Sequence, residues 1–385
     1  MQINRRQWLQ QAGLGMAAIA ALSTTPLSQL FAKPNYNTHT GMWLFNPELE
    51  EDPPLKARLW NNENPYGISP KAQKVFQAQL PEANRYAFSH FATLRNAIAN
   101  YHNVKPENIF ISAGSSEILN ILAIYAGQKQ RSILSAFPTF DPMMNMALAF
   151  ECDWEKVPLT DTWHHDLPAM EKKVNGADIT YICNPNNPTG TLLDPEELKA
   201  FCQRNESRTL LVVDEAYNDF LDDPDANTLI PMVRENHKVI LLRTMSKIHG
   251  FAGLRIGYAI GHPGIVAELE KIRPYALTIN GPALQAAIAA LQDLDFMQYC
   301  RDKNNETKDY SYRVFDELNL PYEKSHTSFI SFGIPITGDH FLKSMRQQGI
   351  GMRAWQFKDR HYGRISMGTI EDMELFASAL KEVLG

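Results

Sequence analysis

The sequence is dominated by short, almost continuously apolar segments that alternate with longer stretches of helical periodicity. The apolar segments lie at residues 108–112, 132–135, 178–183, 209–213, 238–242 and 255–260. Segments this short, without polar residues at alternate positions, are typical of strands buried on both faces of a parallel sheet. We therefore expect an α/β fold whose large domain is a mostly parallel sheet covered by helices. A smaller α+β domain is expected to follow, with strands near 328–333 and 363–367.

Polar motifs follow four of these strands, at or just after the point where each strand ends. They are Gly114-Ser115-Ser116-Glu117, Asn184 to Gly190, Asp214-Glu215-Ala216-Tyr217 and Thr244-Met245-Ser246-Lys247. The carboxyl ends of parallel strands share one edge of the sheet, and ligands bind at that edge in open α/β folds. The pattern therefore predicts one site built from all four motifs. Ser115 is also expected to cap the helix that follows Gly114.

The N-terminal segment has the layout of a targeting peptide. Arg5 and Arg6 precede a small-residue apolar stretch, and the segment has no acidic residue. An adjacent arginine pair in this position is typical of twin-arginine export signals. We expect residues 1–32 to be a signal peptide and the mature protein to be exported to the periplasm, with cleavage after Ala32 or after Ser23. The alternative is a helix that stays attached to a cytoplasmic enzyme.

The rest of the chain divides into three parts. Residues 33–70 are rich in Pro and Asn and predict an extended N-terminal arm. Residues 71–285 carry the strands and polar motifs of the large domain. Residues 286–385 are expected to form the small C-terminal domain. No apolar run is long enough to span a membrane.

Charge and cysteine content exclude several classes of protein. The 385-residue chain has a formal net charge of −6, and its Lys and Arg residues are scattered, which argues against a nucleic-acid surface. The cysteines are Cys152, Cys183, Cys202 and Cys300. They lack the spacing of metal ligands and are too few for a disulfide framework, so we expect unpaired buried thiols and no metal site.

Together, the motifs resemble those of fold-type I enzymes that use pyridoxal 5′-phosphate (PLP), and within that group the histidinol-phosphate aminotransferases. The resemblance runs from Asn61 to Thr369. It rests on Asn62-Glu63-Asn64-Pro65-Tyr66, on Asn184 to Gly190, and on Ser246-Lys247 followed by Gly253-Leu254-Arg255. It implies a PLP-dependent aminotransferase that moves an amino group from an amino acid or amino-phosphate donor to a 2-oxo acid such as 2-oxoglutarate. It also implies a homodimer with shared active sites.

Lys247 and Asp214 are the expected catalytic centre. A lysine just beyond a buried strand is desolvated, which lowers its pKa and favours the neutral amine that attacks an aldehyde. Taken alone, Lys247 would be read as a surface residue, but the resemblance implies that it holds PLP as a Schiff base and moves the substrate's α-proton. Asp214 follows an apolar strand, where an ionised carboxylate needs a partner. The resemblance gives it the pyridine nitrogen of PLP, and its alternative role is to cap the next helix.

Further cofactor contacts are implied by the same resemblance. Tyr217 and Asn187 match the residues that hydrogen-bond the phenolic oxygen of PLP, although Asn187 could simply be a turn residue. Phe140 stands where the family usually has a tyrosine stacked on the ring, so stacking is kept and the hydroxyl is lost; its alternative role is that of an ordinary core residue. Tyr86 resembles the tyrosine that reaches the phosphate of the neighbouring subunit's PLP.

The phosphate of PLP needs amide donors and cations. Gly114-Ser115-Ser116 opens a helix, whose free N–H groups and dipole favour an anion. Ser116 replaces an Asp that is common in the family, which leaves the backbone contacts intact. Ser246 and Arg255 are expected to complete the phosphate site, because a guanidinium can bind two phosphate oxygens at once.

The substrate contacts follow from the C-terminal third and the arm. Arg364 matches the arginine that binds the substrate's anionic end, and Arg353 resembles a second anion contact. Tyr66 and Asn187 match positions that touch substrate. Two other functions remain open at this point: a threonine-phosphate decarboxylase-like PLP lyase, and a non-catalytic protein that kept the fold.

Overall fold

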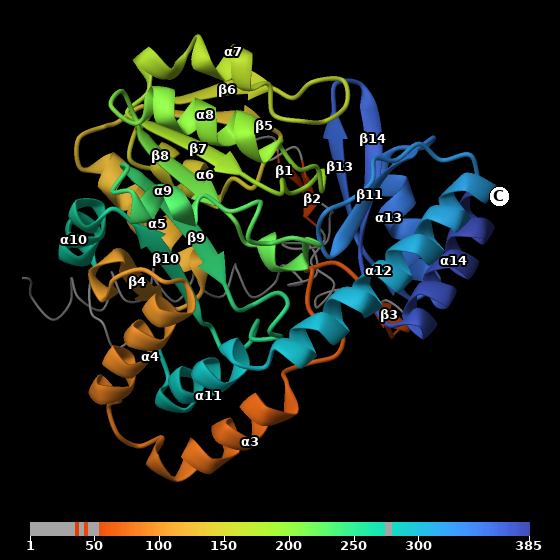
Figure 1. The fold of residues 1–385 in the computed structure, drawn as a ribbon. Helices are drawn as coiled ribbons and strands as arrows, with labels where there is room; N and C mark the ends of the chain where they lie inside the picture. Colours follow the sequence, from red (N-terminus) through yellow and green to blue (C-terminus); the bar gives the residue numbers. More distant parts are fainter. Residues whose placement is uncertain (1–34, 38–41, 45–53, 274–278) are drawn as a thin grey trace, which may run out of the picture.

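The computed structural model describes residues 35–37, 42–44, 54–273 and 279–385 (Figure 1). The predicted signal peptide at 1–32 lies outside the described residues. The strands are β1 Asn35–Asn37, β2 Met42–Leu44, β3 Ala57–Arg58, β4 Ile109–Ser112, β5 Ile133–Phe137, β6 Trp154–Pro158, β7 Ile179–Cys183, β8 Leu210–Asp214, β9 Val239–Thr244, β10 Gly257–Gly261, β11 Phe329–Ile334, β12 Ile350–Gly351, β13 Arg353–Phe357 and β14 Arg360–Ser366. The helices are α3 Pro70–Gln79, α4 Phe88–Tyr101, α5 Ser115–Gly127, α6 Pro142–Leu148, α7 Leu167–Glu171, α8 Pro195–Asn205, α9 Ile230–Arg234, α10 Pro263–Ile272, α11 Gly281–Leu291, α12 Leu294–Glu317, α13 Gly338–Gln347 and α14 Ile370–Leu384.

A seven-stranded sheet in the order β4-β10-β9-β8-β7-β5-β6 forms the large domain. All of its strands except β10 run in the same direction, which confirms the mostly parallel sheet. β10 is antiparallel because it follows β9 without an intervening helix. It begins at Gly257, so the expected strand at 255–260 was placed two residues too early. The edge strand β6 was not expected, because its residues are only partly buried and do not form an apolar run.

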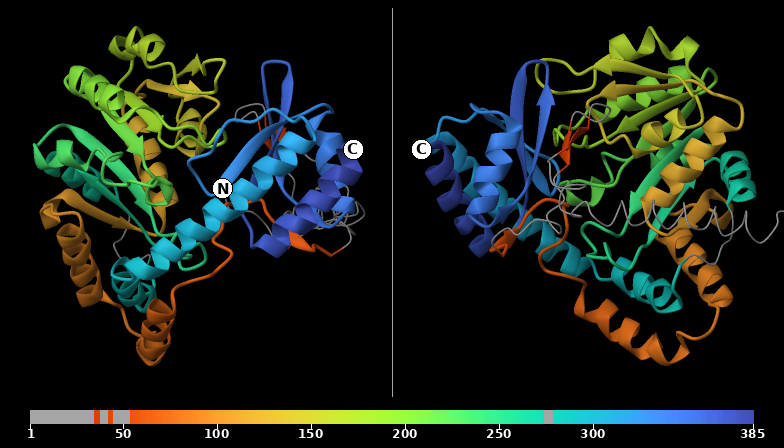
Figure 2. Two further views of the ribbon diagram at one scale, coloured as in Figure 1. Left: turned by 45° about the vertical axis from the view of Figure 1, so that its right-hand side comes forward. Right: turned by 180° about the vertical axis from the view of Figure 1, so that it is seen from behind.

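A second sheet, in the order β1-β2-β13-β14-β11, is antiparallel throughout and forms the smaller unit (Figure 2). The arm expected at 33–70 contributes β1 and β2 to this sheet, and β3 pairs with β12. The expected boundary between residues 285 and 286 falls inside α11, which packs against α3 and α4. Residues 292–293 separate α11 from α12, and α12 then runs toward the small sheet.

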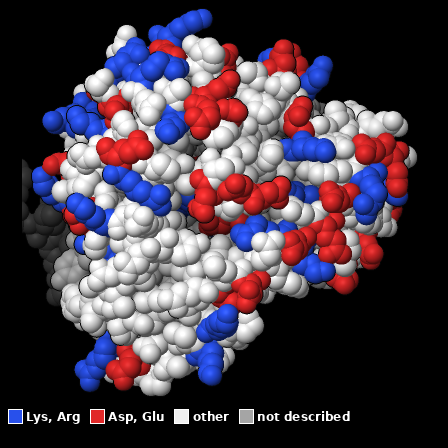
Figure 3. Space-filling model, viewed as in Figure 1, with Lys and Arg blue, Asp and Glu red and all other residues white. Residues whose placement is uncertain are grey.

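The surface carries charges of both signs. On the face shown in Figure 3, Lys and Arg alternate with Asp and Glu, while the area over α4 and α11 carries few charged groups. Within the described parts of the chain, no helix has the length and apolarity needed to cross a membrane. The four cysteines are buried and unpaired, as expected from the sequence.

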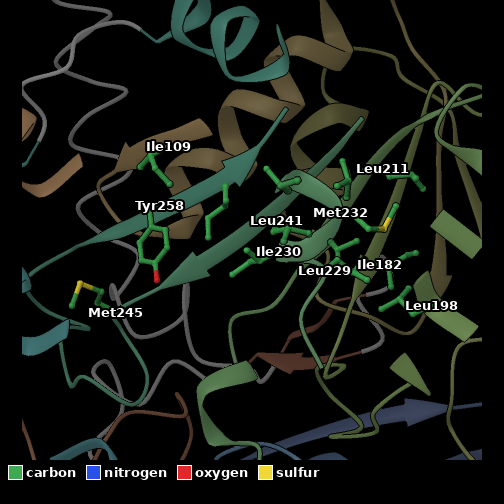
Figure 4. Packing of buried hydrophobic residues seen from close by; sticks show 14 of the residues in the cluster. Ile109, Ile182, Leu198, Leu211, Leu229, Ile230, Met232, Leu241, Met245 and Tyr258 are labelled. Atoms are coloured by element: carbon green, nitrogen blue, oxygen red, sulfur yellow. The ribbon is translucent and has the colours of Figure 1, made fainter. Parts of the chain in front are cut away.

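Each face of the large sheet packs against its own group of helices. Leu211 and Val213 of β8 belong to one apolar cluster and Val212 to the other, because successive strand residues point to opposite faces. Figure 4 shows the first cluster, in which Leu241 of β9 packs near Met232 of α9. Helices α5, α6 and α10 supply the second cluster. Burial on both faces fixes the sheet, and the site is built on the edge where β8 and β9 end.

Candidate active site

Lys247 lies three residues beyond β9, in the turn that follows Thr244. Its Nζ donates to the carbonyl oxygen of Asn61 at 3.1 Å and lies 5.7 Å from the ring centre of Tyr217. Burial, and then the charge of Arg364, lowers the pKa of Lys247 to about 8. A neutral amine is therefore accessible near neutral pH, as attack on an aldehyde requires.

Asp214 is the last residue of β8 and is 1% exposed. One carboxylate oxygen accepts from the Tyr181 hydroxyl at 3.0 Å, and the other accepts from the backbone N–H of Ala216 at 3.1 Å. Burial raises the pKa of Asp214 to about 6, against the lowering effect of these two hydrogen bonds. Asp214 does not cap the next helical turn, which begins at Asn218. A buried carboxylate at this edge can bind a cationic N–H, which would stabilise its ionised form.

Arg364 joins the two units of the molecule. Its Nη1 donates to Asn187 Oδ1 at 2.7 Å, and both side chains are buried. The guanidinium carbon of Arg364 lies 5.2 Å from the ring centre of Phe329, and the Tyr217 ring packs nearly perpendicular to the same phenyl group. Burial, and then the charge of Arg353, lowers the pKa of Arg364 to about 9. An anion bound beside this guanidinium would relieve both effects.

Residues 60–62 cross the site and contact its cations. The carbonyl oxygen of Trp60 accepts from Arg353 Nε at 3.0 Å and from Arg364 Nη2 at 2.7 Å. Asn61 accepts from Lys247 through its carbonyl oxygen and from Arg353 Nη2 through its side chain, the latter at 2.9 Å. Asn62 Nδ2 donates to the Tyr217 hydroxyl at 2.8 Å. Four functional groups from distant parts of the chain, Arg353, Arg364, Lys247 and Tyr217, are thus held around one segment.

Gly114 and Arg255 form another wall of the site. Gly114 is the residue that caps α5, with φ +79°, and Ser115 is the first helical residue, so the expected cap was placed one residue too late. A Cβ on Gly114 would lie 2.3 Å from Arg255 Nη2, so glycine is required for this approach. Arg255 donates to the carbonyl oxygens of Ala113 and Ala252 at 3.2 and 3.0 Å. It lies in the turn before β10, with φ +60°.

Three serines lie at this wall and differ in how deeply they are buried: Ser115, Ser116 and Ser246. Ser115 is partly buried and Ser116 is exposed at the first turn of α5. Ser246 is 8% exposed, and its Oγ accepts from Thr244 Oγ1 at 3.0 Å. The free N–H groups of a helix start, together with an arginine, make a suitable site for a phosphate.

Phe140 and Tyr66 lie on connecting segments near the same edge. Phe140 follows β5 and is partly buried. Its loop is tied to the Asn184–Gly190 loop by Thr139 Oγ1, which donates to Asn186 Oδ1 at 2.8 Å. The Tyr66 ring packs edge-on against Tyr299 at 5.2 Å, and burial raises the pKa of Tyr66 to about 12.

Tyr86 is the one predicted site residue that the structure separates from the others. Its side chain is 78% exposed, and its ring contacts Phe88 at 6.1 Å between centres. No contact links it to Lys247 within the described chain. Phe88 and Leu80, on the same part of the surface, are also more than half exposed.

Several residues around the site were not assigned from the sequence. They are Trp60, Asn61, Asn62, Tyr181 and Ser366. Asn62 belongs to a motif that the sequence analysis quoted, but only Tyr66 of that motif was given a role. Tyr181 could have been found only from the pairing of β7 with β8, which places it near Asp214.

The residues present fit PLP. Among the described residues, no cationic side chain bonds to the buried Asp214, and the buried Nε of Arg364 has no hydrogen-bond partner. Lys247 has the lowered pKa that a covalent link to an aldehyde requires. Gly114, which has no Cβ, lets the Arg255 guanidinium lie against the start of α5, where a phosphate can bind. These features suit a ligand with a ring nitrogen, an aldehyde and a phosphate.

Comparison with known proteins agrees with this chemistry. Residues 56–380 match the family model described as aminotransferase class I and II. A histidinol-phosphate aminotransferase from Brevibacillus brevis is 36% identical over 330 residues, which cover 85% of this chain and 90% of that protein. One from Caldicellulosiruptor saccharolyticus is 34% identical over 332 residues, with 85% and 91% covered.

A solved structure has the same fold. The histidinol-phosphate aminotransferase from Sinorhizobium meliloti, in complex with pyridoxal 5′-phosphate, has a TM-score of 0.80 at 27% identity, covering 86% of this chain and 91% of that chain. The fold, the cofactor and the reaction expected from the motifs are confirmed by these comparisons. The chain therefore belongs to the class I and II aminotransferases, and it is a transaminase that uses pyridoxal 5′-phosphate.

Proposed function

We propose that this transaminase uses an amino donor with an anionic group at its far end, such as the histidinol phosphate for which its relatives are named, and a 2-oxo acid acceptor such as 2-oxoglutarate. The observation that carries this is the pairing of Arg353 with Arg364 across β13 and β14. Like charges placed opposite each other destabilise a sheet. Neither arginine is ion-paired with a carboxylate of the described chain, so a substrate anion is the natural partner.

The chemical step is assigned to residues at the ends of β8 and β9. Lys247 forms the covalent link to the cofactor and transfers the proton at the substrate's α-carbon. Bound PLP supplies an electron sink for the charge that develops on that carbon. Asp214 pairs with the pyridine nitrogen, Tyr217 and Asn187 hydrogen-bond the phenolic oxygen, and Phe140 stacks on the ring. The support for these roles is the geometry around Lys247 together with the family motifs.

The phosphate is assigned to the wall at the start of α5. Gly114, Ser115 and Ser116 present backbone N–H groups and the positive end of the helix dipole. Ser246 adds a hydroxyl, and Arg255 adds a guanidinium that can exchange its bonds to backbone carbonyl oxygens for two phosphate oxygens.

Substrate binding is assigned to the side of the site formed by β13 and β14. Arg364 binds the anionic end that is common to donors and acceptors. Arg353 binds a second anion, and Tyr66 lines the site. Asn187, held by Arg364, contacts substrate as well as cofactor.

A donor panel tests this proposal. The PLP-loaded enzyme is assayed with histidinol phosphate, neutral amino acids and dicarboxylic amino acids, each with 2-oxoglutarate, pyruvate and oxaloacetate. The expected result is keto product without CO2, with the highest kcat/KM for a donor that carries a distal anion. Stoichiometric release of CO2 would instead identify a lyase, and a preference for donors without a distal anion would refute the role of Arg353.

We propose that the active unit is a two-fold dimer in which Tyr86 contacts the phosphate of the other subunit's cofactor. Its support is the exposure of Tyr86 and of Phe88, whose rings contact each other, since exposed apolar groups that lie together mark interaction sites. An isologous interface would place the same surface of both copies in contact.

Hybrid dimers test the shared site. Inactive Lys247→Ala chains and Tyr86→Ala chains are mixed under conditions that exchange subunits. Because each hybrid has one site with both residues intact, mixing should restore up to about a quarter of the wild-type activity, the share of intact sites after random exchange. Self-mixed samples of each variant are the control. A fully active monomer in light scattering would refute the proposal.

We propose that the enzyme is exported by the twin-arginine route. One support is Arg5-Arg6 ahead of an apolar stretch. The other is that the site is formed by Lys247, Asp214 and Arg255, which are distant in sequence. PLP can bind only after the chain has folded, and the twin-arginine route carries folded proteins. Cell fractionation and sequencing of the mature N-terminus test this. Full-length protein confined to the cytoplasm, with no change on replacing both arginines by lysine, would refute it.

A further inference from the structure

Asn62 connects β14, the strand that carries Arg364, to Tyr217 through buried hydrogen bonds. Its Nδ2 donates to the Tyr217 hydroxyl at 2.8 Å. Its Oδ1 accepts from Ser366 Oγ at 2.8 Å, and Ser366 Oγ accepts from the backbone N–H of Asn62 at 2.8 Å. Asn62, Tyr217 and Ser366 are 2–3% exposed. Ser366 is two residues beyond Arg364 on β14, so the chain of bonds spans both units.

The two bonds to Ser366 fix which way the Asn62 amide points. Ser366 Oγ accepts the backbone N–H of Asn62 and donates its own hydrogen to Asn62 Oδ1. The NH2 group of Asn62 must then face Tyr217. The backbone of Asn62 is also fixed, because its φ of +54° lies in the left-handed region, which Asn adopts more readily than most residues.

The consequence concerns the hydrogen of the Tyr217 hydroxyl. Because this oxygen accepts from Asn62, its own hydrogen cannot point at Asn62 and is free for another acceptor. Within the described residues this hydrogen has no acceptor, and Lys247 Nζ lies over the Tyr217 ring, 5.7 Å from its centre. An accepted hydrogen bond also polarises the hydroxyl and strengthens the bond that it donates.

We propose that Asn62 is a positioning residue that directs the hydroxyl hydrogen of Tyr217 toward the phenolic oxygen of the cofactor, and that Ser366 holds Asn62 in this orientation. The inference rests on the role proposed above for Tyr217. It extends the site to two residues that need not touch the cofactor. It also means that a shift of β14, which carries Arg364, would reach the cofactor through Ser366 and Asn62.

The test is a pH titration of the visible absorption of the PLP-loaded enzyme without substrate. A donated hydrogen bond stabilises negative charge on the phenolic oxygen, so a weaker bond lets the cofactor hold its titrating proton more tightly. Asn62→Gly, which keeps the backbone conformation, and Ser366→Ala should each raise the absorption midpoint by roughly 0.3–1 pH unit. Tyr217→Phe should raise it by more.

A double-variant cycle separates positioning from a general structural effect. In a Tyr217→Phe background, Asn62→Gly should leave the midpoint unchanged, because the group through which it acts is gone. Asn108→Ala is the matched control, since it removes another buried Asn amide, which donates to the Gly261 carbonyl at 2.9 Å. It should lower stability without moving the midpoint.

The outcomes distinguish the two proposals. If Tyr217→Phe leaves the midpoint unchanged, the role of Tyr217 fails, and the inference about Asn62 fails with it. If Tyr217→Phe moves the midpoint but neither Asn62→Gly nor Ser366→Ala does, only the inference is overturned. Equal shifts from Asn62→Gly with and without the Tyr217 hydroxyl would also overturn it. PLP dissociation constants, measured by equilibrium dialysis, verify that each variant is loaded.

Discussion

Arg353 and Arg364 lie directly opposite each other on β13 and β14, and both donate to the carbonyl oxygen of Trp60. The pKa of each guanidinium is lowered by burial, and for Arg364 also by the charge of Arg353. A single carbonyl oxygen thus holds two cations in place, although it carries no formal charge to balance them. A bound anion would provide that charge, and the site is therefore organised before substrate arrives.

Replacing these arginines should separate their roles. Arg364→Ala should raise KM for acidic and neutral donors alike, by roughly ten- to a hundredfold, because it removes a charge-assisted pair of about 1.5–3 kcal/mol. Arg353→Ala should raise KM mainly for donors with a second anion. Steady-state kinetics with a matched donor series measures both effects. Arg360→Ala, on the exposed start of β14, is the control, and equal effects from it would show that the losses are not specific.

Cofactor attachment should depend on pH through Lys247. Its pKa of about 8 lies below the usual value of 10.5, so the neutral amine becomes the main form as pH rises through about 8. The rate at which the apo-enzyme forms a borohydride-trappable link to PLP should therefore rise up to that pH and then level off. Arg364→Gln removes a charge that lowers this pKa, so it should move the midpoint to higher pH.

Two variants complete that experiment. Lys247→Ala should form no trappable link and lose turnover by at least about a hundredfold, the usual minimum for removing a proton-transfer group. Lys271→Ala, at an exposed ion pair with Glu268, should behave as the wild type. A trapped peptide that contains another lysine would disprove the assignment.

Asp214→Asn should reduce rate more than cofactor affinity. The variant keeps the shape of the side chain but loses the negative charge that stabilises a protonated pyridine nitrogen. The expected loss in kcat is on the order of a hundredfold or more, the usual cost of removing one electrostatic contact from a reacting centre. The PLP dissociation constant should change much less. Asp178→Asn, at the other end of the sheet, serves as the control, and unchanged turnover in Asp214→Asn would refute the role.

Stability of the apo-enzyme should fall in mild acid because of His165. This side chain is buried, and desolvation lowers its pKa to about 4, against a weaker opposing effect of Asn186. The unfolded chain binds this proton near pH 6.5 and the folded chain only near pH 4. Its contribution to stability is therefore complete above pH 6.5 and is lost as pH falls toward 4, up to about 3 kcal/mol.

Urea unfolding of wild type and His165→Leu at several pH values measures this effect. The difference in unfolding free energy between the two proteins should change between pH 7 and pH 4 in favour of the variant. Exposed His340→Leu should show no such trend. A difference that is constant with pH would mean that His165 is protonated equally in both states.

The sequence by itself determined the parts of this protein that depend on local chemistry. Continuous apolar runs must be buried on both faces, so β4, β5, β7, β8 and β9 could be placed to within a few residues. The carboxyl ends of parallel strands meet at one edge, so Lys247 and Asp214 could be assigned to one site. The family motifs then led to PLP and transamination, which the comparisons confirm.

Tertiary structure alone decided which distant groups meet at that edge. Residues 60–62 contact Arg364, Lys247 and Tyr217 across sequence separations of 155 to 304 residues, and no local sequence pattern indicates such contacts. The register of β13 against β14, which sets the arginines opposite each other, depends on pairing between strands rather than on either sequence. The direction of β10 and the use of the arm in the small sheet have the same origin. Burial patterns specify which face of a strand is apolar, while its neighbours are chosen by the packing of the whole chain.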